Sequence, residues 1–423
     1  MNKRQQSLPG PDDITRVCLP NGITVLVRAN FNSPSVVIGG HLTSGSLFDP
    51  NEKIGLADFT ALGLLRGTEN RSFQKIFDEL ESAGANLSFG AGAHNTGFSG
   101  RSLSEDLPLI LSLLADTLRH PLFPPEEIER LRAQFLTSLA QRAEDTADMA
   151  SITFDQMVFK GHPYARPEDG WPETIRAIQR DDLANFHQRS FGPRGMVIAL
   201  VGAVNPKQAV EEVEKVLGDW INPEQLETPS LPRLRPIKKT ISRKVKIPGK
   251  YQSDLVIGAV GPYRKDPDYI ADSLGNSALG QFGLGGRIGD VVREKSGLAY
   301  YASSSLSAGI GPGSWNVSAG VNPANVQKAQ DLICQEIERF VTKGIKAEEL
   351  ADSQSNFIGR LPLSLESNSG VASALLNIER YELGLDYYRR YPDLVRAVTA
   401  EQVLAGVRKY LDPERLAIAV AGP

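Results

Sequence analysis

Five histidines are the residues of this chain best suited to bind a metal or move a proton, and their spacing gives no site. They are His41, His94, His120, His162 and His187. No two stand three or four residues apart, the spacing that places two imidazoles on one helical face. The sequence also has no G-x-S-x-G elbow, no G-x-x-x-x-G-K-[ST] loop and no C-x-x-C pair. Spacing alone therefore predicts no catalytic constellation, and each histidine is interpreted as a surface or hydrogen-bonded structural residue.

The composition predicts a globular protein of more than one domain. The 423 residues are 41% hydrophobic and 23% charged, with a formal net charge of -4. This composition argues against a disordered chain and against a dedicated nucleic-acid binder, which is usually basic. No stretch is apolar enough to span a membrane, and the polar N-terminus lacks a signal-peptide core. We therefore expect a cytoplasmic chain, or a periplasmic one if a signal peptide was removed. The two cysteines, Cys18 and Cys334, form neither a disulfide framework nor a zinc cluster.

The first half of the sequence alternates between strand and helix patterns. Asn21-Gly22 lies between two alternating apolar runs, which predicts a β-hairpin. Further strands are expected at residues 35–42 and 196–201. Helices are expected where apolar residues recur at helical spacing, at residues 55–65, 72–83, 107–118 and 125–142.

The second half repeats this plan at a constant offset. IRAIQRDDL at residues 175–183 resembles VRAVTAEQV at residues 395–403, an offset of 220 residues. The same offset aligns the later strand MVIALVG with LAIAVAG. An offset kept through a helix, a turn and a strand indicates a duplicated unit. We predict an α+β protein with two homologous domains, residues 1–221 and 251–423, each an antiparallel-rich sheet packed by helices, that face each other across a cavity.

A basic, proline-rich segment joins the two copies. Residues 222–250 contain five prolines, and no acidic residue occurs from Thr228 to Ser253. We interpret the segment as a solvated interdomain linker that leads into the first strand of the second copy. The alternative is a patch that binds an anion or a partner.

The segment GGHLTSGSLFDPNEKIGLADFTALGLLRGT resembles the opening of the pitrilysin/insulinase (inverzincin) family. This family includes the mitochondrial processing peptidases and small two-domain bacterial metallopeptidases. Its active members carry H-x-x-E-H on the helix here, with two zinc-binding histidines and a glutamate that activates water. In this chain Asp58 and Leu62 stand at the histidine positions, and Ala61 stands at the glutamate position. The third ligand would fall at Thr137 or Ser138. The resemblance implies a degenerate site and no metal bound by this chain.

The segment ALGQFGLGGRIGDVVREKSGLAYYASS of the second copy resembles the same family. There Arg293 and Tyr300 match the family's substrate-contacting Arg/Tyr pair, which reaches the zinc domain across a cavity between the two domains. Guanidinium and phenol groups both donate hydrogen bonds and suit a carbonyl or oxyanion. Considered without the resemblance, Arg293 is a surface charge at a helix end and Tyr300 a residue of an amphipathic strand.

Two further features follow from the resemblance. A peptide is expected to add to a strand edge near residues 86–91, unless that edge is covered. Gly283, Gly285 and Gly286 could let their turn approach a substrate or partner, although glycines more often serve a tight turn.

The resulting hypothesis is a non-catalytic, substrate-binding subunit of a heteromeric zinc peptidase. A homologous partner would supply the zinc and H-x-x-E-H, while this chain would supply Arg293 and Tyr300. The alternative is a structural or peptide-binding core protein without a proteolytic role. An independent enzyme with an unfamiliar site is the least favoured interpretation, because the sequence offers no constellation for it.

Overall fold

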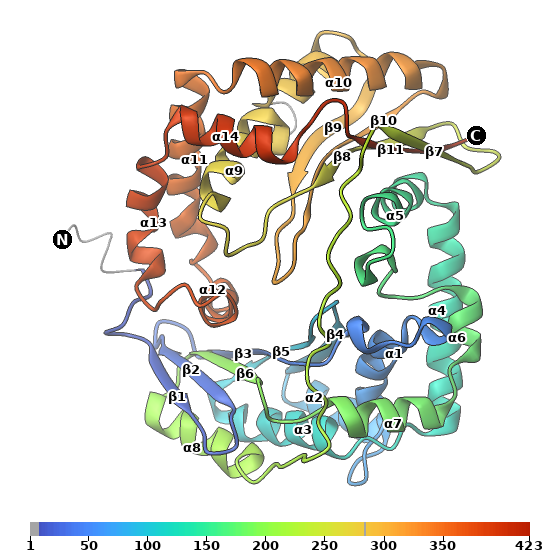
Figure 1. Cartoon of the computed structure of the whole chain (residues 1–423). Coiled ribbons are helices and arrows are strands. Elements are labelled where there is room, and N and C mark those ends of the chain that lie inside the picture. Colours follow the sequence, from blue (N-terminus) through green and yellow to red (C-terminus); the bar gives the residue numbers. More distant parts are fainter. Residues whose placement is uncertain (1–7, 283–284) are drawn as a thin grey trace. The chain divides into compact units, whose positions relative to one another are not determined.

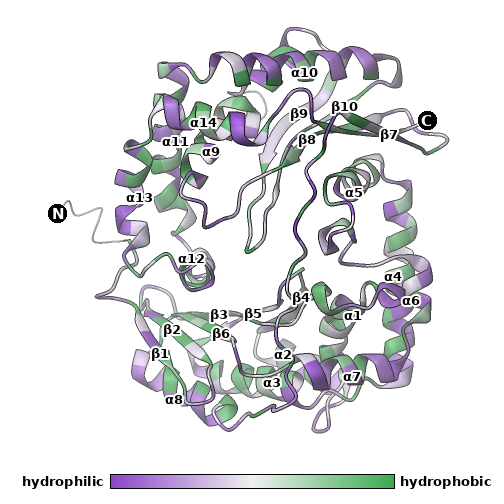
Figure 2. Cartoon of the chain, in the orientation of Figure 1, coloured by the Kyte–Doolittle hydropathy of each residue, from purple (hydrophilic) through white to green (hydrophobic). Residues whose placement is uncertain are grey.

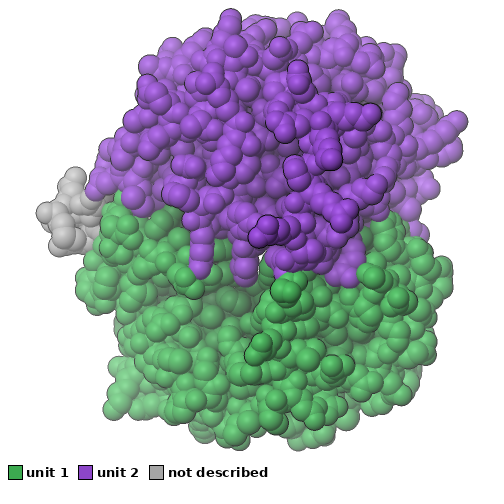
Figure 3. Space-filling view, in the orientation of Figure 1, with its two compact units in different colours: residues 1–139, 167–230, 361–390 green, residues 140–166, 231–360, 391–423 purple. Residues whose placement is uncertain are grey.

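The computed structural model describes residues 8–282 and 285–423 of the chain. These residues divide into two compact units, coloured separately in Figure 3. Of the described residues, unit 1 comprises 8–139, 167–230 and 361–390, and unit 2 comprises 140–166, 231–282, 285–360 and 391–423. Each unit holds one β-sheet packed by helices, so the predicted α+β class is confirmed.

Unit 1 is built on a six-stranded sheet with the order β1-β2-β6-β3-β5-β4. Only β2 and β6 run parallel, and every other neighbouring pair is antiparallel. The central strand β6 reads VIALVG and is buried throughout, as an apolar run covered on both faces must be. The strands are β1 (Thr15–Cys18), β2 (Thr24–Ala29), β3 (Ser35–Leu42), β4 (Asn86–Ala91), β5 (Thr96–Leu103) and β6 (Val197–Gly202).

The helices of unit 1 cover both faces of this sheet. α12 lies on the face opposite α3 and α8 (Figure 1). Each helix turns apolar residues toward the core and polar ones outward, as the mixed colours along α3 and α7 show (Figure 2). The helices are α1 (Leu56–Gly63), α2 (Phe73–Ser82), α3 (Leu107–Arg119), α4 (Pro125–Glu144), α6 (Pro172–Ala177), α7 (Arg180–Ser190), α8 (Pro206–Leu217) and α12 (Asn368–Arg380).

Unit 2 repeats the sheet of unit 1 without its first strand. Its five strands have the order β7-β11-β8-β10-β9, and only β7 and β11 run parallel. This order matches β2-β6-β3-β5-β4 strand for strand, so the predicted duplication is confirmed. The strands are β7 (Ile241–Lys246), β8 (Ser253–Val260), β9 (Ala299–Leu306), β10 (Ser314–Val321) and β11 (Ala417–Gly422).

The helices of unit 2 also cover both faces of their sheet. α10 packs on one face and α5 on the other (Figure 1). Besides the end of α4, the α-helices that contribute to this unit are α5 (Thr146–Val158), α9 (Tyr269–Asn276), α10 (Val326–Lys343), α11 (Ala347–Ser364), α13 (Tyr387–Arg396) and α14 (Ala400–Tyr410). α4, α11 and α13 each contribute residues to both units.

The two sequence copies exchange one helix each. α5 belongs to the first copy, yet it packs against β8 and β11 of unit 2. α12 belongs to the second copy, yet it packs against β3 and β6 of unit 1. Both helices have 13 residues and start at equivalent places, Thr146 and Asn368. The compact units therefore differ from the sequence repeats, and the boundaries 1–221 and 251–423 remain a prediction about homology.

The local sequence signals for helices and turns act as expected. Gly22 has φ 94° in the β1–β2 turn, a value that favours glycine. Ser72 caps α2 by accepting a hydrogen bond from the amide of Lys75. β7 lies inside the predicted linker, residues 222–250, so Arg243, Lys244 and Lys246 belong to the second sheet and not to a solvated linker. Within the described residues, no helix combines the length and apolar composition that a membrane crossing requires.

Candidate functional site

The degenerate zinc-motif positions lie on one short helix of unit 1. α1 starts after Gly55, which adopts the left-handed backbone conformation with φ 97°. The carboxylate of Asp49 accepts hydrogen bonds from the amides of Gly55 and Ala57, each at 2.9 Å, and so fixes the helix start. Asp58 and Leu62 are four residues apart and share one helical face. The structure therefore places the two positions predicted for histidine ligands, Asp58 and Leu62, on the same side of α1.

That face of α1 borders a cavity of about 420 Å³. The structure brings Asp58, Ala61, Leu62 and Ser138 to the same cavity, so Ser138 is the nearer candidate for the lost third-ligand position. Thr137 instead bonds to the carbonyl of Ala133 on its own helix. The lining is largely apolar, and beyond these four residues it includes Leu65, Arg66, Phe77, Ser88, Phe89, Leu131, Gln134, Phe135, Leu139 and Asp169.

Asp58 is a half-buried acid with a perturbed pKa. Burial raises the pKa of its carboxyl to about 6, and the nearby Asp169 carboxylate adds to the rise. A hydrogen bond from the amide of Ala91 at 3.1 Å acts in the opposite direction. Burial likewise raises the pKa of Glu168, with Asp58 and Asp169 contributing. Sequence reasoning missed Glu168 and Asp169, because they reach α1 from a loop far along the chain.

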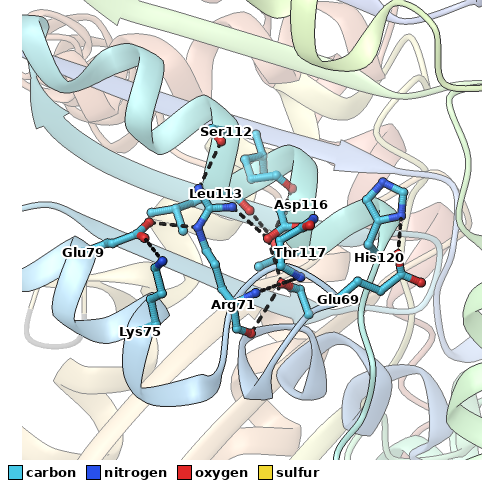
Figure 4. A network of polar contacts seen from close by, with 12 residues as sticks. Glu69, Arg71, Lys75, Glu79, Ser112, Leu113, Asp116, Thr117 and His120 are labelled. Carbon is cyan, nitrogen blue, oxygen red and sulfur yellow. Dashed lines mark hydrogen bonds and ion pairs between the residues drawn. The ribbon is translucent and has the colours of Figure 1, made fainter.

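A polar network holds the segment that follows α1 (Figure 4). Arg71 pairs with Asp116 of α3 and with Glu79 of α2, each at 2.9 Å. Asp116 also accepts hydrogen bonds from Thr68 and Asn70, each at 2.7 Å. Burial alone would raise the pKa of Asp116, but the bonds from Asn70, Thr68 and Arg71 lower it below its usual value. The network therefore fixes α2, which contributes Phe77 to the cavity.

The strand beside this cavity, β4, is the edge of its sheet. Gly92 donates to the carbonyl of Asn95 at 2.8 Å, and hydrogen-bonded pairs alternate along an antiparallel ladder. In the observed register the amides and carbonyls of Leu87, Phe89 and Ala91 therefore point away from β5, toward the outer edge of the sheet. The amide of Ala91, which points outward in this register, donates its hydrogen bond to Asp58.

Arg293 and Tyr300 flank the junction between a helical turn and the edge strand of unit 2. Arg293 lies in a π-helical turn, Gly289–Glu294. Its side chain is 44% exposed, and its Nε lies 4.0 Å from Oε1 of Glu294. The turn ends at Gly297, where φ is 61° and the amide bonds to the carbonyl of Arg293. Tyr300 follows in β9 and is 65% exposed.

Tyr300 is the extra residue of a β-bulge. Ala299 pairs with Val321 and Tyr301 pairs with Gly320, so Tyr300 has no register partner on β10. A bulge bends its strand and redirects a side chain. Of the predicted glycines, Gly285 and Gly286 line a cavity of unit 2, whereas Gly283 lies outside the described residues.

Two models of one peptidase family match the chain in tandem. The model described as insulinase (peptidase family M16) matches residues 24–167, and the model described as peptidase M16 inactive domain matches residues 177–357. The chain belongs to the insulinase family. Both models come from that family, and the insulinase model precedes the inactive-domain model along the chain.

The insulinase-family relatives match nearly the whole chain. A Streptomyces coelicolor protein described as an uncharacterized zinc protease is 26% identical over 98% of this chain and 90% of its own length. The probable mitochondrial-processing peptidase subunit beta of Arabidopsis thaliana is 24% identical over 97% of this chain and 78% of its own. A crystal structure of a peptidase M16 inactive domain from Pseudomonas fluorescens is 26% identical, with a TM-score of 0.89 over 97% of this chain and 98% of its own.

The zinc that this family implies does not fit the residues on α1. A catalytic zinc takes about three protein ligands, whereas Leu62 and Ala61 have no ligand atom and Ser138 offers a hydroxyl. Among the described residues, no group of three or more His, Cys, Asp or Glu side chains could hold a metal ion. The cavity is thus a mostly apolar hollow with one titratable carboxyl on α1.

The five histidines lie apart from this cavity's lining. Burial lowers the pKa of His41 to about 3 and that of His187 to about 4. His187 lies 2.8 Å from the carbonyl of Leu118, and His162 accepts the amide of Tyr164. His120 lies 3.8 Å from Glu69, and His94 belongs to the β4–β5 turn. His187 and His162, buried with backbone partners, act as structural residues. His41 differs from the expected hydrogen-bonded histidine, because its buried Nδ1 has no hydrogen-bond partner in the structure.

Proposed function

We propose that this chain is the non-catalytic, substrate-binding subunit of a heteromeric zinc peptidase. A homologous partner supplies the zinc site, and this chain supplies Arg293 and Tyr300. The observation that carries the proposal is the contrast between the two family motifs. Every zinc-motif position lacks its ligand or base, whereas the Arg/Tyr pair is present and exposed at a bulged edge strand.

The two retained side chains suit contact with a substrate backbone. A guanidinium and a phenol each donate hydrogen bonds, which stabilise the charge that develops on a carbonyl oxygen during hydrolysis. Zinc held by the partner activates the attacking water. The proposal is supported by similarity to a mitochondrial-processing peptidase subunit, which its name describes as part of an assembly.

The test is recovery of the native complex. The tagged chain is purified from its own cells, and bound proteins are identified by mass spectrometry. We expect a homologue that carries H-x-x-E-H, one zinc per pair by metal analysis, and peptidase activity that chelation removes. Stoichiometric zinc in this chain by itself, or activity without a homologous partner, would refute the assignment.

A second candidate is a peptide-binding core protein without a proteolytic role. The open edge of β4 beside an apolar cavity favours it, because main-chain groups of Leu87 and Phe89 are oriented to pair with an added strand. Similarity to cytochrome b-c1 complex subunit 1 of mouse, 27% over 62% of this chain, supports it as well. Normal turnover by complexes that lack both Arg293 and Tyr300 side chains would favour this candidate.

A further inference from the structure

One row of residues crosses the sheet of unit 2 directly beside Tyr300. Tyr301 of β9 pairs with Gly320 of β10, and Gly320 pairs with Asp254 of β8. Residues opposite one another across neighbouring strands share one face of the sheet. Gly320 has no side chain, so the phenol of Tyr301 extends across it toward Asp254. Its hydroxyl donates to Asp254 Oδ1 at 2.6 Å.

Gly320 is the residue that makes this crossing possible. A Cβ at this position would lie 2.5 Å from Cε1 of Tyr301 and 2.7 Å from Nε2 of Gln252. Neither distance is compatible with a real side chain, so any larger residue would displace the tyrosine ring. The Tyr301 ring therefore packs directly over the backbone of Gly320.

Asp254 is a fixed acceptor for that phenol. The residue is 1% exposed, and Gln252 donates to both carboxylate oxygens at 3.0 Å. The hydroxyl of Thr146, the first residue of α5, donates to Oδ2. Burial and the bond to Asp254 raise the pKa of Tyr301, so its phenol stays protonated and remains a donor. A buried carboxylate with several donors is held in one place.

We infer that Asp254 and Tyr301, joined across Gly320, are positioning residues that fix the direction in which the bulge presents Tyr300. The extra residue of a bulge lacks the register pairing that orients other strand residues. Its neighbour Tyr301 is anchored at both the backbone and the hydroxyl. These two contacts of Tyr301 therefore fix the peptide plane between Tyr300 and Tyr301. The orientation of that plane sets the direction in which the Tyr300 side chain leaves the strand.

The inference rests on the proposed function, because Tyr300 is assigned a substrate contact there. The first test is independent of that assignment. The protein is labelled with 3-fluorotyrosine, and the ¹⁹F line of Tyr300 is assigned among the 11 tyrosines with Tyr300→Phe. We expect Tyr301→Phe and Asp254→Asn to shift or broaden this line. The control is Ser303→Ala, which lies on β9 on the same face as Tyr301, with its Oγ 3.5 Å from Oγ of Ser318. We expect this change to leave the ¹⁹F line of Tyr300 unchanged.

The second test is a double-mutant cycle in the native complex. Tyr301→Phe lowers kcat/KM by about fivefold in the wild-type background and by less than about twofold in the Tyr300→Phe background, because the first residue acts through the second. An unchanged ¹⁹F line, or additive effects of the two changes, overturns the positioning role. If Tyr300→Phe itself leaves turnover unchanged, the proposed function fails, and the ¹⁹F line still decides whether the anchor exists.

Discussion

The carboxylate of Asp58 accepts a hydrogen bond from the backbone amide of Ala91, with 3.1 Å between Oδ1 and N. This bond ties α1 to the outer edge of β4. The family resemblance predicts a degenerate zinc-ligand position at Asp58, and in the structure the same carboxylate forms a link between a helix and a strand. The bond occupies the Ala91 amide, which is one of the outward-facing main-chain groups of this edge strand.

The Arg/Tyr pair is expected to control turnover by the native complex. Arg293→Ala or Tyr300→Phe removes one donor to a developing oxyanion, which typically costs about 10²–10³ in rate. Zinc content and subunit association stay unchanged, because neither residue is assigned to metal or interface. Steady-state kinetics of the reconstituted pair measure the effect, with kcat falling more than KM rises. A change in kcat/KM below about threefold for both variants would leave the pair without the proposed role.

Restoring the motif on α1 is expected to be insufficient for catalysis. Asp58→His, Ala61→Glu and Leu62→His supply two ligands and a base but no third ligand, and a catalytic zinc takes about three protein ligands. Adding Ser138→Glu places a carboxylate at the cavity, whereas adding Thr137→Glu does not. We expect zinc affinity at least about tenfold higher for the Ser138→Glu combination. Isothermal titration with zinc compares the two, and equal affinities would show that the third position is misplaced.

The buried acid of α9 is expected to make stability depend on pH. Asp272 is 0% exposed, and neither carboxylate oxygen has a hydrogen-bond partner in the structure. Burial, followed by the charges of Asp268 and Asp266, raises its pKa from 3.8 to about 7. The folded state therefore favours the protonated acid, and stability is lost as pH rises from about 4 through 7. Asp272→Asn is expected to gain about 2–4 kcal/mol at pH 8 relative to its effect at pH 4.

Urea unfolding at several pH values measures this difference. The control Asp268→Asn alters a neighbouring acid whose side chain is 50% exposed, and is expected to change the stability by under about 1 kcal/mol. A pH-independent effect of Asp272→Asn would show that Asp272 is ionised in the folded protein.

The network in Figure 4 is expected to contribute strongly to stability. Arg71→Ala leaves the carboxylate of Asp116, whose side chain is 5% exposed, without its charged partner. Breaking a buried pair in this way costs about 3–5 kcal/mol. Arg130→Ala removes an exposed arginine that pairs with Glu126 and Glu127, and costs under about 1 kcal/mol. Chemical denaturation of both variants gives the comparison, and similar losses would contradict the ranking.

The exchange of helices is expected to make the two halves of the sequence interdependent. A fragment of residues 231–423 lacks α5 and exposes Val256, Ala417 and Ala419, which α5 covers in the intact chain. A fragment of residues 1–230 lacks α12 over β3 and β6. Each fragment is expected to aggregate alone and to form a soluble one-to-one complex when both are co-expressed. A monomeric, cooperatively unfolding fragment 231–423 would contradict this expectation.

The sequence predicted the elements well where the signal was local. Asn21-Gly22 forms its turn, Ser72 caps its helix, and the 220-residue offset matches two sheets of the same strand order. The turn and the cap each depend on a few neighbouring residues, and the repeat is visible by comparing one half of the sequence with the other. All three can therefore be identified without knowledge of contacts between distant residues.

The remaining features depend on contacts between distant residues. The charge of Asp58 acts on Glu168, Asp254 binds Tyr301, and α5 and α12 pack on the sheet of the other copy. None of these pairings has a periodicity or a cap that a single sequence reveals. Sequence comparison assigned Tyr300 a role, but only the register of β9 and β10 shows that a bulge presents it.

The reciprocal placement of α5 and α12 constrains how such proteins can be recombined. A chimera that joins the first half of this chain to the second half of a relative would place each exchanged helix on a foreign sheet. Working hybrids must therefore take α5 from the same parent as β8 and β11, and α12 from the same parent as β3 and β6. The natural crossover points are the ends of these two helices rather than the linker between the halves.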